Sequence, residues 1–475
     1  MDIVLYFVLH QPLRIRPIIG YPLGATPSNP YELFNWDLNQ VIFRRISEKV
    51  YIRASKILLD NLKMFKDFKI TLSISGLAIE LMEKWAPEAL RILQDMVETE
   101  RVELCAQTYY HSVTWLIDNE EFIEQIREHI AKIREVFGYI PKSAENTEFI
   151  YNNDVACTLA KLGFKTTVTE GIDWIKGFKG SNYVYEAYGC NIRVLLRNYR
   201  LSDDLAFRFN LRTWDQYPLT ADKYASWLES SPGDVILIAL DYETFGEHQP
   251  PESGIYEFLQ WLPREVSKRS RLKFATLYEA ALNNKPVGII DIPPWSTISW
   301  ADERDLSAWA GNEIQRIHLD MLKLLYYYAK ALGGEYLRLW RLYSVSDHFY
   351  YQATKTGPAG EVHSYFNPYG SPYKAQIVYQ QALLILSEYL KSRIKGEECK
   401  FLENFKAPPE LCFYSLKTGV RACSFKELLE LINEHRDLIE YHIREGHIDK
   451  WLRDVLLAGS LEEALSKCSQ SSSKA

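Results

Sequence analysis

Polar side chains follow the apolar segments that this sequence predicts to be β-strands. His10 and Gln11 come after the β-type run 3–9, and the block 241–248 comes after the almost wholly apolar run 234–240. In a parallel α/β barrel, functional groups lie just after the carboxyl ends of the strands. We therefore expect these polar and acidic side chains to gather at one end of a barrel.

Two carboxylates in this set suggest glycoside hydrolysis. That reaction needs one carboxylate and one carboxylic acid flanking the scissile bond. Asp241 directly follows a predicted strand and has aromatic neighbours that could raise its pKa, and Glu148 lies in a short polar segment before a predicted helix. Taken singly, Asp241 could be a turn or N-cap residue, Glu148 a solvated loop acid and His10 a buried histidine. Their shared location at strand ends is what favours catalysis.

A metal site is the main chemical alternative. Four residues could converge as the ligands of a metal-dependent polysaccharide deacetylase: His10, His111, Asp241 and His248. The sequence has no HxxxH or CxxC spacing to support such a site. We therefore expect no metal ion and no other cofactor.

The elements that must position these groups alternate along the first 290 residues. Strands are predicted at 3–9, 69–75, 102–106, 165–169, 193–196, 234–240 and 273–276. Helices are predicted over 38–64, up to 98, 120–137, 152–162, 253–268 and from 277. Strands that alternate with helices imply a parallel sheet with crossovers, most simply a barrel.

The pattern changes after the barrel segment. Three helical stretches follow with no predicted strand between them: 305–332, 335–355 and 373–395. We therefore expect a helical bundle. A third piece then combines a strand-like segment at 411–416 with helices over 425–442 and 448–457. The predicted domains are a barrel over 1–290, a bundle over 291–398, a small α+β module over 399–468 and a disordered tail over 469–475.

The amino-acid composition argues against some classes of binding partner. The net charge of −7 argues against a broad nucleic-acid surface, and 47% apolar with 25% charged residues is ordinary for a folded chain. No stretch of 18 uncharged apolar residues is present, so no membrane partner is expected. The 31 Tyr and 12 Trp residues combine apolar faces with polar groups, which suits binding of a polyhydroxylated ligand as well as core packing.

The cysteines and the N-terminal segment indicate the compartment. Seven scattered cysteines argue against a zinc ribbon and a secreted disulfide framework, and residues 1–10 lack the features of a secretory signal. A cytoplasmic protein with mostly buried thiols is therefore expected. Disulfides remain open if the source is a hyperthermophile, and the oligomeric state is open as well.

Five sequence blocks occur in an order that is highly specific as a set. They are His10-Gln11-Pro12, 106–112, Asn146-Thr147-Glu148, 241–248 and Thr276-Leu277-Tyr278-Glu279. Together with Ser299-Trp300-Ala301-Asp302 and Ser346-Asp347-His348 they cover about residues 1–395. This pattern resembles glycoside hydrolase family 57, a retaining family active on α-glucans.

The resemblance implies a fold and a set of roles. The implied fold class is α/β, a distorted (β/α)7 barrel followed by a helical bundle that completes the cleft. Glu148 is implied as the nucleophile and Asp241 as the general acid/base. Further residues expected to bind an α-1,4-glucan or maltooligosaccharide are His10, Gln11, His111, Trp115, Glu243, His248, Trp300 and Asp302.

The expected activity is α-amylase-type hydrolysis through a covalent glucosyl-enzyme. A 4-α-glucanotransferase would use the same intermediate, so this alternative stays open, as do α-1,6 cleavage, branching and galactosidase action. A non-catalytic glucan-binding homologue would be expected to lose one catalytic carboxylate, and both are present.

Two features stand apart from this pattern. Members of the family often carry Glu where this chain has Gln107, which leaves one carboxylate contact and the specificity open. Residues 402–467 resemble a small domain of unassigned function that is appended to some carbohydrate enzymes, and we expect an accessory module there.

Overall fold

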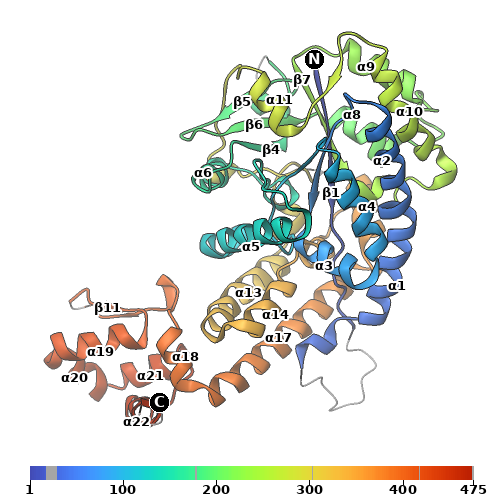
Figure 1. Ribbon diagram of the computed structural model, residues 1–475. Coiled ribbons are helices and arrows are strands. Elements are labelled where there is room, and N and C mark those ends of the chain that lie inside the picture. The colour runs from blue at the N-terminus through green and yellow to red at the C-terminus, as the bar shows by residue number, and fades with distance from the viewer. Residues whose placement is uncertain (18–28, 177–178, 302, 417, 473–475) are drawn as a thin grey trace. The chain divides into compact units, whose positions relative to one another are not determined.

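The computed structural model describes residues 1–17, 29–176, 179–301, 303–416 and 418–472. The chain forms two compact units (Figure 1). The first consists of Met1–Leu13, Trp36–Asn312 and Val345–Tyr365. The second consists of Arg14–Asn35, Glu313–Ser344 and Phe366–Ala475. Residues in the interval 291–398, where a bundle was expected, are thus shared between the two units.

Strand β1 (Asp2–Leu9) lies in the middle of the sheet of the first unit. All eight of its residues are buried. It pairs in parallel with β2 (Ile70–Ile74) on one side and with β7 (Val235–Asp241) on the other, while β8 (Lys273–Phe274) pairs with its first residues. An almost wholly apolar sequence is what a parallel strand needs when both of its faces are covered.

The sheet closes on itself through two isolated bridges. Strand β3 (Val102–Leu104) is parallel to β2, and Ala106 then bridges Ala144. Ser143 in turn bridges Thr166 at the start of β4 (Thr166–Glu170). Strand β4 is parallel to β6 (Arg193–Arg197), which reaches β7 through Arg197 and Leu237. The closed circuit is β1, β2, β3, residues 143–144, β4, β6 and β7, and the expected (β/α)7 fold class is confirmed.

Two short strands extend the sheet beyond this circuit. Strand β5 (Val184–Ala187) is antiparallel to β6, and β9 (Ile289–Ile290) is parallel to β5. Neither strand was predicted, because runs of four and two residues carry little periodicity.

Helices follow the strands of the first unit, and their starts carry the expected capping residues. Asn152 accepts a hydrogen bond from the Val155 amide at 3.0 Å, and Thr276 forms a reciprocal capping box with Glu279. The helices of this unit are α1 (Trp36–Ile46), η2 (Ser47–Ile52), α2 (Arg53–Met64), α3 (Gly76–Trp85), α4 (Pro87–Glu98), η3 (Thr114–Leu116), α5 (Asn119–Phe137), η4 (Thr147–Phe149), α6 (Asn153–Lys161), α7 (Asp173–Lys176), α8 (Tyr199–Asp203), η5 (Asp204–Arg208), α9 (Ala221–Ser230), η6 (Tyr242–Thr244), η7 (Pro251–Ser253), α10 (Ile255–Ser267), α11 (Leu277–Asn283), η8 (Pro294–Ser296), α12 (Ser307–Ala310), α15 (Ser346–Tyr350) and α16 (Gly357–Phe366).

The prediction of one continuous helix over 335–355 is wrong, and the break in it affects the site. Helix α14 ends at Tyr343, and α15 begins only at Ser346. Between them Val345 is extended and bridges Ser112, and the Ser346 amide donates to the His111 carbonyl at 3.0 Å. Tertiary pairing with the segment after β3 thus overrides the local helical preference. Helix α16 also occupies part of the loop expected at 357–372.

The second unit is mainly helical. Helices α13 and α14 are joined by a hydrogen bond from the Trp340 indole to the Leu322 carbonyl at 2.8 Å, and α17 bonds the end of α14 through the Tyr379 hydroxyl and the Tyr343 carbonyl at 2.7 Å. Its elements are η1 (Pro30–Leu33), α13 (Glu313–Leu332), α14 (Gly334–Tyr343), α17 (Pro372–Gly396), α18 (Glu398–Asn404), η9 (Pro409–Leu411), β10 (Phe413–Tyr414), β11 (Arg421–Ala422), α19 (Phe425–Glu434), α20 (Arg436–Arg444), α21 (His447–Asp454) and α22 (Leu461–Ser472).

The expectation of mostly buried thiols is wrong. Disulfides join Cys157 to Cys190, Cys399 to Cys468 and Cys412 to Cys423, while Cys105 is a buried free thiol. These pairs are separated by 33, 69 and 11 residues, so spacing along the chain did not reveal them.

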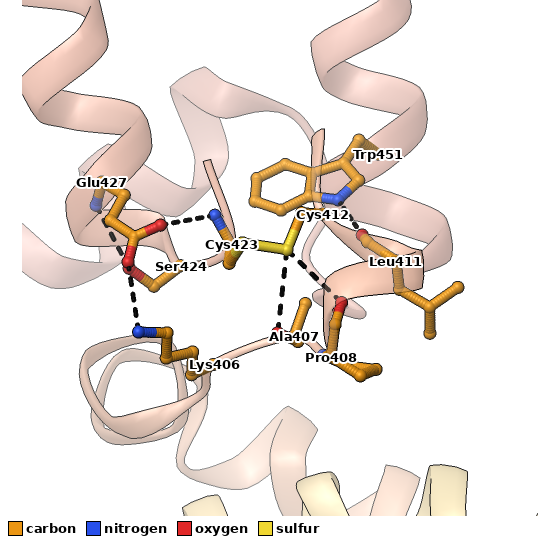
Figure 2. Close-up of a disulfide and its surroundings, with 9 residues drawn as sticks. All are labelled: Lys406, Ala407, Pro408, Leu411, Cys412, Cys423, Ser424, Glu427 and Trp451. Carbon is orange, nitrogen blue, oxygen red and sulfur yellow. Dashed lines mark hydrogen bonds and ion pairs between the residues drawn. A yellow bond between two sulfur atoms is a disulfide. The ribbon is translucent and has the colours of Figure 1, made fainter. Parts of the chain in front are cut away.

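Figure 2 shows the Cys412–Cys423 disulfide between the ends of the β10–β11 hairpin. Around it the Trp451 indole donates to the Leu411 carbonyl at 2.7 Å, and the Cys423 amide donates to Glu427 at 2.6 Å. Ser424 caps α19, accepting from the Glu427 amide at 3.2 Å. The hairpin is thereby attached both to α19 and to α21.

Two further expectations concern membrane-spanning helices and the C-terminal tail. In the part of the chain that the structure describes, no helix combines the length and the apolar character needed to cross a membrane. Of the tail expected to be disordered, residues 469–472 belong to helix α22, and 473–475 lie outside the described residues.

Candidate active site

The carboxyl ends of two neighbouring strands bring the first pair of predicted residues together. Asp241 is the last residue of β7, and the register places it beside Val8 of β1, two residues before His10, which follows that strand. Because both strands are buried in the sheet, the position of each group is set by rigid backbone. This edge of the barrel is where functional groups of parallel barrels are found.

Glu148 lies in a strained turn at the same end of the barrel. Its φ is +60°, and that of Phe149 is +52°. Two consecutive non-glycine residues in the left-handed region cost about 1–3 kcal/mol each, so surrounding contacts must hold them. The Trp300 amide donates to the Glu148 carbonyl at 3.2 Å, and the Thr169 hydroxyl donates to the Phe149 carbonyl at 3.2 Å.

Three side chains orient the Glu148 carboxyl group. The Trp300 indole donates to Oε2 at 2.8 Å, and the Ser346 hydroxyl donates to Oε1 at 2.8 Å. His111 Nε2 lies 3.5 Å from the same Oε1. The side chain is only 14% exposed, so these contacts leave it little freedom. Ser346 was not predicted as a site residue, although Ser346-Asp347-His348 is part of the family pattern.

The surroundings of Asp241 raise the pKa of its carboxyl group. Burial raises its pKa, and the nearby charge of Glu148 raises it further. His111 and Arg197 act in the opposite direction, and the resulting pKa is about 7. Asp241 is therefore protonated in a large fraction of molecules near neutral pH, whereas an ordinary aspartic acid is not.

Glu243 occupies a buried pocket next to Asp241. It accepts hydrogen bonds from the Tyr51 hydroxyl and, at 3.3 Å, from Gln11 Nε2. Burial first, and then the charge of Asp241, raise its pKa to about 8. The structure thus brings Gln11 to the site as a partner of Glu243, and it adds Tyr51, which no local sequence signal marked.

His10 and His111 form a stacked pair. Their ring centroids are 4.4 Å apart with an interplanar angle of 23°. His10 Nδ1 lies 2.8 Å from the Ser75 hydroxyl, and its Nε2 lies 3.4 Å from the Asp347 carboxylate. Burial, and secondarily His111, lower the pKa of His10 to about 4. His10 is therefore largely neutral near neutral pH, and its hydrogen bond to Ser75 is its closest polar contact of the two.

An ion-pair network supports Trp300 from the barrel side. Arg304 donates to the Trp300 carbonyl at 2.6 Å and to Glu170 at 2.8 Å. Arg197 donates to Glu170 at 3.0 Å and to Asp203 at 2.6 Å, and its guanidinium lies 5.8 Å from the Trp300 ring. Glu170 is fully buried. This network was not predicted, because its residues belong to no recognisable sequence motif.

Three further residues, Trp115, His248 and Asp302, were predicted to bind substrate. Trp115 packs edge-on against Phe122 of α5, at 5.2 Å, and joins the core cluster there rather than the contacts around Glu148. His248 is 6.0 Å from the ring of Tyr365, and burial lowers its pKa to about 4. Asp302 lies outside the described residues.

The residues considered as metal ligands do not form a metal-binding cluster. Among the described residues, no group of three or more His, Cys, Asp or Glu side chains has an arrangement that could hold a metal ion. His10 and His111 stack on each other, and each directs ring nitrogens to hydroxyl, amide or carboxyl partners.

Comparison with known proteins gives the family. Residues 4–293 match the family model described as Glycosyl hydrolase family 57. A Methanocaldococcus jannaschii protein named "Putative alpha-amylase" is 41% identical over 409 residues, which are 84% of this chain and 86% of that protein. The 4-alpha-glucanotransferase of Thermococcus litoralis is 19% identical over 278 residues, which are 58% of this chain and 41% of that protein.

Solved structures agree in fold. A GH57 branching enzyme from Thermococcus kodakaraensis superimposes with a TM-score of 0.58 at 13% identity, covering 91% of this chain and 94% of that chain. Because the family model matches more than half of the sequence and the archaeal relative matches most of it, the chain belongs to glycosyl hydrolase family 57.

Proposed function

We propose that this protein cleaves α-1,4-glucosidic bonds with retention of configuration, with Glu148 as the nucleophile and Asp241 as the general acid/base. The observation that carries the proposal is the electrostatic difference between the two carboxyl groups. Asp241 has a pKa of about 7 and feels the charge of Glu148, whereas Glu148 is held by the donors Trp300 and Ser346. Two carboxyl groups with such different surroundings can serve as acid and nucleophile.

In the first step, a Glu148 oxygen attacks the anomeric carbon of the sugar while the glycosidic bond breaks. Asp241 gives its proton to the departing oxygen, so the shortened glucan leaves as an alcohol. The product is a glucosyl ester of Glu148. Hydrogen bonds from Trp300 and Ser346 orient the attacking carboxyl group.

Ester formation prepares the second step. It removes the negative charge of Glu148, which is one of the groups that raise the pKa of Asp241. The pKa of Asp241 therefore falls in the intermediate, and its carboxylate can accept a proton from water. Water attacks the anomeric carbon, the ester bond breaks, and Glu148 leaves as a carboxylate.

The substrate class rests on the relatives. The most extensively matching relative quoted above carries an alpha-amylase name, which favours hydrolysis of α-1,4-glucan. The glucanotransferase relative matches only 58% of this chain, and transfer to a sugar hydroxyl would use the same intermediate. Incubation with maltoheptaose separates the two activities. Only shorter products with rising reducing ends indicate hydrolysis, and longer products indicate transfer.

Substitution of each carboxyl group, combined with azide rescue, tests the assignment of Glu148 as the nucleophile and Asp241 as the acid/base. Glu148→Gln should lower kcat on maltoheptaose by about 10³-fold or more, because the covalent route is lost. In Glu148→Ala, azide should attack an activated α-glucosyl substrate directly and give the β-glucosyl azide. In Asp241→Ala, azide should attack the glucosyl ester and give the α-glucosyl azide.

Glu88→Gln is the matched control, because Glu88 forms an exposed pair with Lys56. Its turnover should equal that of the wild type. Turnover that survives Glu148→Gln would rule out the nucleophile assignment, and an α-azide from Glu148→Ala would exchange the two roles.

A further inference from the structure

Four hydrogen-bonded side chains lead to Glu148 from the barrel interior. Ser73, Gln107 and Glu145 are at most 1% exposed, and His111 is 5% exposed. Ser73 Oγ lies 2.7 Å from Glu145 Oε1, and Gln107 Nε2 lies 2.8 Å from Ser73 Oγ. Gln107 Oε1 lies 2.7 Å from His111 Nδ1. The other ring nitrogen of His111 faces Glu148, so the four groups end at the proposed nucleophile.

The Gln107 amide gives these hydrogen bonds a direction. Its nitrogen can only donate and its oxygen can only accept. The structure places the amide nitrogen toward Ser73 and the amide oxygen toward His111. With the nitrogen facing Ser73, Gln107 donates to Ser73 and Ser73 donates to Glu145. The Gln107 oxygen is then left to accept from His111 Nδ1, which must carry a hydrogen.

The backbone of Gln107 is held as firmly as its side chain. Its amide donates to His129 Nδ1 at 3.0 Å, and His129 Nε2 lies 2.6 Å from the Ile74 carbonyl. His129 is fully buried, and burial lowers its pKa to about 4. A neutral His129 that accepts at Nδ1 and donates at Nε2 satisfies both contacts, so Gln107 is attached to the end of β2.

A neutral His111 with its hydrogen on Nδ1 would present a lone pair to Glu148. Repulsion between that lone pair and the carboxylate is removed only when Nε2 is protonated as well. We propose that Gln107 is a positioning residue that keeps a hydrogen on His111 Nδ1, so that His111 meets the Glu148 carboxylate as an imidazolium. The proposal rests on the proposed function of Glu148.

The charged and titratable groups around His111 agree with this arrangement. They are Glu148 on η4, Glu145 just before it, Asp347 on α15, His10 after β1 and Asp241 at the end of β7. Burial by itself lowers the pKa of His111. The hydrogen bond and charge of Glu148, followed by Asp347 and Glu145, overcome that effect and raise the pKa above its ordinary value.

An imidazolium at this position bears on the first step of the proposed reaction. It stabilises the Glu148 carboxylate before attack. In the free enzyme its positive charge also lowers the pKa of Asp241. Gln107 thereby acts on both reacting carboxyl groups without touching the substrate. An amide is suited to this role because, unlike a carboxyl group, it does not titrate and cannot reverse the direction of the hydrogen bonds.

Nitrogen-15 NMR of the histidine rings in the full-length protein tests the proposal without turnover. The His111 signals can be assigned with His111→Asn. In the wild type, the neutral form that appears above the His111 pKa should carry its hydrogen on Nδ1. Gln107→Glu places a carboxylate at Nδ1 and should raise the His111 pKa by about one pH unit or more. Gln107→Leu removes the acceptor, so the neutral form should move its hydrogen to Nε2 and the pKa should fall.

Gln125→Leu is the matched control. Gln125 is also fully buried and bonds Ser112 and Glu121, so its loss should lower the melting temperature but leave the His111 titration unchanged. A wild-type neutral form with its hydrogen on Nε2 would overturn the proposal, as would an unshifted His111 pKa in Gln107→Glu. These two measurements decide the matter even if Gln107→Leu does not fold.

Kinetics provide a separate readout. With Gln107→Leu, kcat on maltoheptaose should fall about tenfold or more with little change in KM, because Gln107 lies behind His111 and acts on the reacting carboxyl groups. If azide rescue fails to support Glu148 as the nucleophile while the NMR shifts occur as expected, the proposed function fails and the control of the His111 proton stands.

Discussion

The proposed catalytic end of the barrel and residues 399–468 of the second unit, which we expect to be an accessory module, are stabilised by different means. Around Glu148 and Asp241 the contacts are hydrogen bonds and charge interactions between groups that can change protonation. The module has short strands, and the disulfides Cys399–Cys468 and Cys412–Cys423 link its segments. A reaction that moves protons requires titratable partners, whereas a small core gains from covalent links.

This difference predicts that activity at the barrel site depends on pH and on single charged groups. It also predicts that the stability of the module depends on its disulfides.

Asp241→Asn should have the largest effect. It should lower kcat/KM on maltoheptaose by about 10²–10⁴-fold, because general acid catalysis is lost. In the wild type, the protonated form of Asp241 is the acid and its pKa is about 7, so kcat/KM should fall as the pH rises through about 7. This alkaline decline should be absent when the variant is assayed on a substrate with a good leaving group. A decline that persists unchanged in the variant would assign it to another group.

Glu170→Gln should have the next largest effect, on stability. Glu170 is fully buried between Arg197 and Arg304, so the variant removes one of the two carboxylates that these guanidinium groups share and leaves them Asp203. The free energy of unfolding should fall by about 3–5 kcal/mol, measured by denaturant titration.

Glu186→Gln is a suitable comparison, because the Glu186–Arg193 pair lies at the surface, with side chains 45% and 28% exposed. Its cost should stay below about 1 kcal/mol. Equal costs for the two variants would show that burial of the Glu170 network adds nothing to its stabilising effect.

Breaking the two disulfides of the module should affect the module and spare the barrel, whose own disulfide Cys157–Cys190 stays intact in these variants. Replacing Cys399 and Cys468 by Ser should destabilise the module by about 4 kcal/mol, and replacing Cys412 and Cys423 by about 3 kcal/mol, because the first pair closes the longer loop. Proteolysis of the module in the two double variants and in the wild type would measure this order. Turnover of maltoheptaose at moderate temperature should be unchanged, and a large loss would contradict the contrast between the two regions.

Trp300→Phe should have the smallest effect. The ring contact with Phe149 can persist, but the hydrogen bond from the indole to Glu148 is lost. Because a hydrogen bond to a charged group contributes about 1.5–3 kcal/mol, kcat/KM should fall about 10–100-fold.

Trp309→Phe controls for the loss of a large ring. Trp309 is fully buried, and its indole nitrogen has no hydrogen-bond partner among the described residues. The kcat/KM of Trp309→Phe should remain close to that of the wild type. A similar fall in both variants would assign the Trp300 effect to packing rather than to Glu148.

Local patterns in the sequence were sufficient for the main elements of the barrel. The almost wholly apolar runs at β1 and β7 and the capping residue Asn152 appear where they were predicted. The polar residues that follow the strands also gather at one edge, because the carboxyl ends of parallel strands share that edge. Hydrophobic periodicity and capping are properties of neighbouring residues, so the sequence by itself determined them.

Tertiary structure decided the contacts that join distant segments. Trp300 and Ser346 reach Glu148 across 152 and 198 residues, and the helix predicted over 335–355 breaks so that Ser346 can do so. The disulfide partners and the direction of the hydrogen bonds through Gln107 are likewise invisible to local patterns. The physical reason is that a hydrogen bond or a disulfide depends on which groups meet in space, and chain closure into the barrel determines that meeting.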